Sequence, residues 1–147
     1  MTITLPASVG AEPTDDAGEN VIGGLPDIEG RRCEAFICQR FVFHDEPVED
    51  AGRIYVRFER NWRDLTIDCG VVLWREATGA PEPWAVEDEG WKYPHVNVGE
   101  RAGVIGSRLE ELRTESTPTG ATITFSFENG RKIVIHNQDD RSTFRIV

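Results

Sequence analysis

Six residues in this sequence carry side chains that commonly bind metals or act as nucleophiles and bases. They are Cys33, Cys38, Cys69, His44, His95 and His136. Structural zinc sites usually take their ligands from close pairs such as Cys-x-x-Cys or His-x-x-x-His, and the sequence contains no such pair. We therefore predict no metal site. We expect Cys38 and Cys69 to behave as small apolar residues, with Cys69 on a core face.

The sequence contains none of the catalytic motifs that can be identified by spacing alone. It has no Gly-x-Ser-x-Gly turn, no His-Glu-x-x-His pair and no glycine-rich phosphate loop before a helix. Asp139-Asp140 does not belong to the Asp-x-Asp-x-Asp-Gly pattern of a calcium loop, and adjacent aspartates are typical of turns. We predict no catalytic residues and no cofactor, and we favour a protein that is not an enzyme.

The most informative stretch for function runs from Glu82 to His95, where aromatic and acidic residues are concentrated between two prolines. Tryptophan and tyrosine often dominate the energetics of protein interfaces, and a cluster of like charges can steer a basic partner. We therefore predict a partner-binding site made of Trp84, Glu87, Asp88, Glu89, Trp91 and Tyr93. The alternative is that the tryptophans lie beneath this loop and cap the core of the sheet.

Composition limits the kinds of partner. The formal net charge is −10 and the pI is about 4.7. Such a surface repels nucleic acid and anionic lipid and favours basic proteins. No apolar stretch is long enough to cross a membrane, and the N-terminus lacks the features of a secretory signal. Because three cysteines cannot all pair in disulfides, we expect a cytoplasmic protein.

The predicted fold begins with a hairpin over residues 121–137. Two runs of alternating residues flank Asn129-Gly130, a strong hairpin signal. A three-residue loop over 128–130 places Phe125 opposite Ile133 and Ile123 opposite Ile135 on one apolar face. The other face is mostly polar, so we expect an antiparallel sheet that packs on one side.

Four further segments are predicted to be strands. They are a well-covered strand over 34–44 that ends at Asp45-Glu46-Pro47, a strand over 53–59, a long strand over 65–73 after a loop of even length at 60–63, and a last strand over 143–147. Residues 78–97 are predicted to form a long surface loop with a short strand over 91–98. Residues 103–115 fit a short helix or a bulged strand, and both alternatives remain open.

Together these patterns predict a mainly β protein with at most one or two short helices. We expect an antiparallel, hairpin-based sheet that curls or closes into a small barrel or sandwich. Residues 1–30 are rich in acidic residues, glycine and proline, which predicts a flexible leader. Residues 31–147 are predicted to form a single β-rich domain.

The hairpin from Thr122 to His136, with Phe-Glu-Asn-Gly at its tip, and the acidity of the chain resemble the β-rich immunity proteins and related uncharacterised domains of bacterial toxin-defence loci. The resemblance covers a short part of the chain. It implies a non-enzymatic protein that holds a basic toxin or nuclease domain through acidic and aromatic surface residues. Two alternatives remain: a small-molecule-binding or hydrolytic β domain with an aromatic pocket, and a domain that dimerises through a sheet edge.

Overall fold

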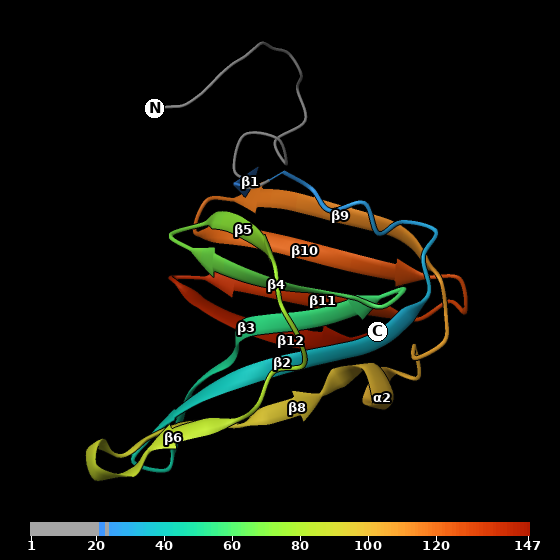
Figure 1. Ribbon diagram of the computed structural model, residues 1–147. Coiled ribbons are helices and arrows are strands. Elements are labelled where there is room, and N and C mark those ends of the chain that lie inside the picture. Colours follow the sequence, from blue (N-terminus) through green and yellow to red (C-terminus); the bar gives the residue numbers. More distant parts are fainter. Residues whose placement is uncertain (1–20, 23) are drawn as a thin grey trace.

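The protein folds into two β-sheets that face each other across one apolar core (Figure 1). The computed structural model describes residues 21, 22 and 24–147. Most of the leader predicted over residues 1–30, namely 1–20 and 23, lies outside this described part. Within it, Ile28 is fully buried and belongs to the core. The prediction of a mainly β protein is confirmed.

The large sheet contains eight strands and extends well beyond the small one. Its strands are β1 (Val21–Ile22), β2 (Cys33–Phe43), β3 (Glu46–Phe58), β4 (Asn61–Asp68), β5 (Val71–Glu76), β6 (Trp84–Val86), β7 (Trp91–Tyr93) and β8 (His95–Asn97). They follow the order β1-β5-β4-β3-β2-β7-β6, and β8 also pairs with β2. All these pairings are antiparallel except that of β1 with β5.

The small sheet has four antiparallel strands in the order β12-β11-β10-β9. They are β9 (Leu109–Thr117), β10 (Gly120–Phe127), β11 (Lys132–Gln138) and β12 (Arg141–Ile146). A single-turn 3-10 helix, η1 (Glu87–Glu89), joins β6 to β7, and the short helix α2 (Val98–Ala102) follows β8. No helix among the described residues is long and apolar enough to span a membrane.

The hairpin predicted over residues 121–137 is confirmed in its register and in its turn. Phe125 lies opposite Ile133 and Ile123 opposite Ile135, and all four side chains are fully buried. The Phe127 amide donates to the Arg131 carbonyl, which closes a three-residue loop. Gly130 adopts the left-handed conformation there, with φ of 88°, which glycine accepts without a steric penalty.

The apolar faces of the two sheets meet in the core. Phe36 of β2 packs edge to face against Phe125 of β10, with ring centroids 4.9 Å apart, and Trp74 of β5 contacts the same Phe125 ring. Ile54, Val56 and Phe58 of β3 are fully buried, as the alternation predicts. Because period-2 side chains supply one buried face per sheet, two layers suffice to enclose this core.

The predicted long strand over 65–73 is wrong, because the chain reverses in the middle of it. Cys69 and Gly70 both have positive φ angles, 51° and 78°, and they form a two-residue turn between β4 and β5 of the kind that suits twisted hairpins. Val72 and Trp74 therefore face the core, while Cys69, predicted to lie on a core face, is exposed.

The turn before β4 also has two residues with positive φ angles. Its length is even, as predicted, but it consists of Glu59 and Arg60, with φ angles of 45° and 75°, rather than residues 60–63. The strand β2 also ends at a two-residue turn, at His44-Asp45, where both φ angles are positive. Pro47, predicted to end that strand, instead pairs with Val42 inside the next strand, β3.

The segment over 103–115 resolves into turn and strand. The helix α2 ends before Gly103, whose φ angle is 70°, and the Asn97 side chain caps its start by accepting from the Glu100 amide. The strand β9 then begins at Leu109. The long surface loop predicted over 78–97 is more ordered than expected, because it contains β6, η1, β7 and β8.

Candidate functional site

One end of the large sheet projects beyond the small sheet and forms what we call the arm, residues 41–50 and 84–93 (Figure 1). It comprises the end of β2, the start of β3, and β6, η1 and β7. Trp91 pairs with Phe43 of β2 and with Val86 of β6. These pairings bring all six predicted partner-binding residues into one substructure.

An aromatic stripe runs across one face of the arm; its members are Trp84, Tyr93, Phe41, Trp91 and Phe43. Trp84 stacks on Tyr93 with ring centroids 4.0 Å apart and planes 14° apart. Tyr93 stacks in turn on Phe41 at 5.3 Å and 13°. The stripe forms because residues two apart in a strand point to the same face, and neighbouring strands bring these positions into register.

The rings of the stripe remain partly accessible to solvent. Trp84 is 51% exposed, Trp91 36% and Phe43 38%. None of the three belongs to the apolar core. The alternative in which both tryptophans cap the sheet core is therefore wrong, and so is the prediction that the strand is well covered as far as Phe43. Large aromatic side chains gathered at a surface in this way often mark an interaction site.

The acidic residues of the site lie at the tip of the arm. Glu87, Asp88 and Glu89 form the single turn η1, and all three are exposed. None of them has an ion pair with another described residue. The turn closes at Gly90, whose φ angle is 77°. The His44 ring packs directly against the backbone of the turn, because a Cβ at Gly90 would clash with it.

The opposite face of the arm is charged rather than aromatic. Lys92, which alternates with Trp91 and Tyr93, pairs with Asp45 at 3.2 Å. Arg40 pairs with Asp50 at 3.3 Å, where the arm joins the rest of the sheet. The arm thus presents an aromatic face, a face with paired charges and an acidic tip whose charges are unpaired within the described residues.

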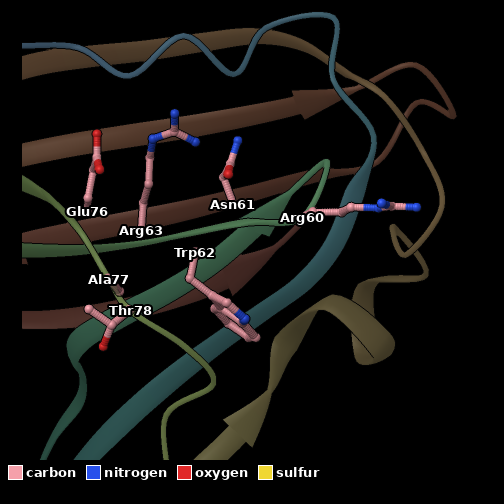
Figure 2. Close-up of a pocket in the computed structure, with 7 residues that line it drawn as sticks. All are labelled: Arg60, Asn61, Trp62, Arg63, Glu76, Ala77 and Thr78. Carbon is pink, nitrogen blue, oxygen red and sulfur yellow. The ribbon is translucent and has the colours of Figure 1, made fainter.

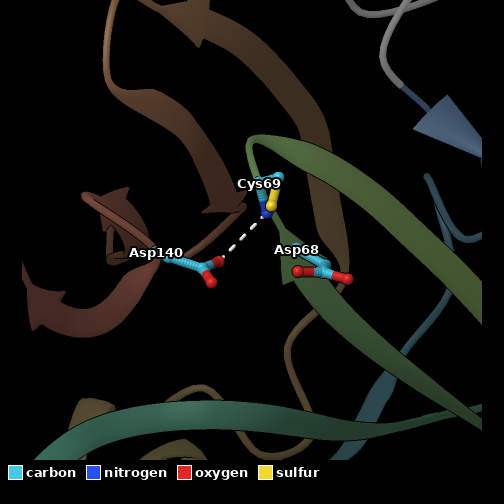
Figure 3. Close-up of side chains that lie close together, drawn as sticks. All are labelled: Asp68, Cys69 and Asp140. Carbon is cyan, nitrogen blue, oxygen red and sulfur yellow. Dashed lines mark hydrogen bonds between the residues drawn. The ribbon is translucent and has the colours of Figure 1, made fainter.

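A second cluster joins the tips of two hairpins, where Asp68, Cys69 and Asp140 bring three possible metal-ligating atoms within 4.8 Å of one another (Figure 3). The Asp140 carboxylate accepts a hydrogen bond from the Cys69 amide at 3.0 Å. A hydrogen bond and the negative charge of Asp68, together with the charge of Asp140, raise the pKa of the Cys69 thiol. A protonated thiol is a poor nucleophile, and the hydrogen bond from the Cys69 amide to Asp140 links the two turns.

The remaining cysteines are held as thiols by burial. Burial raises the pKa of Cys33 to about 12 and raises that of Cys38 further. Neither thiol is therefore ionised near neutral pH, and both behave as small apolar core residues. Burial also lowers the pKa of His95, whose Nε2 lies 3.2 Å from Oε1 of Gln39. Cys33 and Cys38 thus contribute to the apolar core, and His95 lies on β8 beside β2.

A groove of about 350 Å³ lies at the opposite end of β4 from Cys69. Its lining residues, drawn in Figure 2, are Arg60, Asn61, Trp62, Arg63, Glu76, Ala77 and Thr78. Asn61, Arg63 and Glu76 extend to one side of the strand, whereas Trp62 and Thr78 lie on the other. Because these polar groups do not converge and only one ring lines the groove, it lacks the geometry of the aromatic ligand pocket considered from the sequence.

The sequence did not reveal Phe41, Phe43 and His44 as members of the site. They lie some forty residues before Trp84 in the chain, and only the pairing of β2 with β7 brings them together. The available signal is a run of apolar residues at 41–43 on both faces of a strand, which is also typical of a strand covered by other elements.

No protein-family model, curated protein or solved structure matches this chain.

Proposed function

We propose that this chain is a non-enzymatic binding protein whose arm holds a basic protein partner. The observation that carries the proposal is the joint presence, on one projecting substructure, of a half-exposed aromatic stripe and three exposed acidic residues. Aromatic rings supply contact area at low conformational cost, and acidic residues at a rim raise the association rate with a positive surface.

The charges of the arm support a basic partner rather than an acidic or neutral one. The charged groups on the face opposite the stripe are already paired, as in Lys92 with Asp45. The acidic residues of the tip have no ion pair with another described residue, and the formal charge of the whole chain is −10. A partner with lysine or arginine near an apolar patch would satisfy both features together.

The narrower form of the proposal is an immunity protein that holds a basic toxin or nuclease domain. It derives from the resemblance of the Thr122–His136 hairpin and from the acidity of the chain. A gene next to this one that encodes a basic toxin domain would favour the narrower form. Without such a neighbour, the partner remains a basic protein of another kind.

The experiment is a capture of proteins from the native lysate by three versions of the chain: wild type, a tip variant and a matched control. The tip variant carries E87K, D88K and E89K. The control carries E110K, E111K and E115K on β9, which are also exposed and change the net charge by the same amount. We expect wild type and control to retain a basic protein, in a salt-sensitive manner, and the tip variant to lose it.

The result that contradicts the proposal is an unchanged set of captured proteins for the tip variant. Equal loss from the tip variant and the β9 control would contradict it as well. In that case net charge alone, rather than the arm, would determine capture.

A further inference from the structure

We infer that the partner's bound segment adds to the large sheet as an extended strand beside β6, with an arginine or lysine stacked on Trp84. This inference rests on the proposed function, because it specifies how the same arm holds its basic partner. It follows from three properties of β6: its position in the sheet, its free backbone edge and the end of the aromatic stack.

The strand β6 is the terminal strand of the large sheet, and it pairs only with β7. All three of its residues are exposed. An edge strand presents backbone N–H and C=O groups that can pair with another chain. Peptide recognition by strand addition uses these groups for affinity and the neighbouring side chains for specificity.

The outer edges of the small sheet, by contrast, already have hydrogen bonds to other segments. On β9, the Leu109 amide donates to the Arg31 carbonyl and the Leu112 amide to the Glu29 carboxylate. On β12, the Ser142 amide donates to the Glu49 carboxylate at 2.8 Å. Among the described residues, no backbone group of β6 makes such a bond outside its pairing with β7.

The aromatic stack also ends at this edge. The rings follow one another from Phe41 of β2 to Tyr93 of β7 to Trp84 of β6. No further ring or cation stacks on Trp84 among the described residues, and the side chain stays about half exposed. A strand added beside β6 would place its own side chain in the next position of this series. A guanidinium group stacks well on an indole.

Charge selects the occupant of this edge. The acidic turn η1 directly follows β6, so a segment beside β6 lies next to Glu87, Asp88 and Glu89. A second copy of this chain would bring another charge of −10 to the same edge, which opposes self-pairing. A basic extended segment could pair with the backbone of β6, stack a cationic side chain on Trp84 and lie beside the acidic turn η1.

The main probe is a six-residue peptide of alternating arginine and valine with blocked ends, and the acidic control replaces its arginines with glutamates. Two further forms of the basic peptide carry backbone N-methyl groups, one on the arginines and the other on the valines. Backbone N–H groups of successive residues in a strand point to opposite edges. N-methylation of one set therefore removes the donors that face β6, whereas methylation of the other set leaves them intact. Binding to the full chain is measured by NMR at low ionic strength.

We expect the basic peptide to shift the indole signals of Trp84 and Trp91 and to slow hydrogen exchange of the β6 amides, and the acidic peptide to do neither. One methylated peptide should bind at least about tenfold more weakly than the other, as expected for the loss of one or two backbone hydrogen bonds. W84A should weaken binding of the basic peptide, whereas the control W62A, on β4, should not.

Three outcomes overturn the inference, and they differ in what else they affect. If both methylated peptides bind like the parent peptide and E87K/D88K/E89K still abolishes binding, strand addition is wrong and the proposed function stands. If the basic peptide does not bind at all, strand addition by a basic segment is wrong, and the proposed function fails with it only if capture from the lysate is also unaffected by E87K/D88K/E89K. If the free chain is a dimer in sedimentation experiments and W84A dissociates it, the occupant of the edge is a second copy.

Discussion

The core and the arm both contain stacked or edge-to-face aromatic pairs built on alternating strands, yet their exposure differs completely. Phe36 and Phe125 meet between the two sheets and are fully buried. Trp84 and Tyr93 meet on the arm at a shorter distance, 4.0 Å, and Trp84 stays half exposed. The difference arises because the small sheet covers one region and not the other (Figure 1). The same sequence pattern therefore stabilises the fold in the core and leaves exposed aromatic rings on the arm.

The largest effect predicted from this comparison comes from removing one ring in each region. Phe125→Ala should lower the free energy of unfolding by about 3–5 kcal/mol, because it opens a cavity against Phe36 and Trp74. Trp84→Ala should lower it by about 1 kcal/mol or less, the value of an exposed ring pair. Urea unfolding of both variants measures the difference, and equal losses would show that the arm is part of the core.

A smaller effect is expected from two glycines that each lie against a close neighbour. A Cβ at Gly120 would clash with the Asn137 carbonyl oxygen, whereas at Gly90 it would meet the exposed His44 ring. Because the side chain can rotate away and the backbone cannot, Gly120→Ala should cost about 3 kcal/mol and Gly90→Ala about 1–2 kcal/mol, mainly from its positive φ. Gly79→Ala, which meets nothing within 4 Å, is the control; a greater loss at Gly90 than at Gly120 would contradict the comparison.

The free energy of unfolding should depend on pH through Glu49, which lies where the arm meets the small sheet. Burial raises the pKa of this carboxyl, although its hydrogen bond from the Ser142 amide opposes the shift. The folded state therefore binds the proton more tightly than the unfolded state, and stability falls as pH rises through the raised pKa. Glu49→Gln stays neutral and can still accept from Ser142, so its stability relative to wild type should increase as pH rises from the ordinary glutamate range through the raised pKa of Glu49. A stability difference between Glu49→Gln and wild type that stays constant with pH would contradict a role for the raised pKa of Glu49.

The smallest effect on stability is predicted at the tip of the arm. Reversal of Glu87, Asp88 and Glu89 to lysine should change the free energy of unfolding by about 0.5 kcal/mol or less, because exposed charges without partners contribute little. Thermal and urea unfolding test this. A large loss of stability would mean that loss of partner capture by the same variant reflects unfolding, and it would weaken the separation between core and arm.

The sequence was most predictive where turn chemistry and alternation agreed. At Glu128-Asn129-Gly130 the turn residues determine the loop length, and the loop length determines the register of Phe125 with Ile133. At Cys69-Gly70 the chain turns through two residues without an Asn-Gly signal. A single strand carried through Cys69 and Gly70 keeps the alternation of the preceding residues, which places Cys69 on the core face, whereas the turn leaves it exposed.

The candidate site could be predicted in part, for a related reason. Trp84, Trp91 and Tyr93 lie close together in the sequence, so their composition was enough to indicate a candidate interaction site. Phe41 and Phe43 join them only through the pairing of β2 with β7, which depends on tertiary structure. Strands of three residues such as β6 and β7 are too short for their periodicity to be recognised.

The central claim is that the arm, and not the covered sandwich, contacts a basic partner in the cell. The most direct test places a photo-crosslinking phenylalanine analogue at Val86 on the arm and, for comparison, at Thr124 on the outer face of the small sheet. We predict that Val86 forms an adduct with a basic protein, that E87K/D88K/E89K abolishes this adduct, and that Thr124 forms none. Adducts from Thr124 without any from Val86 would contradict the account.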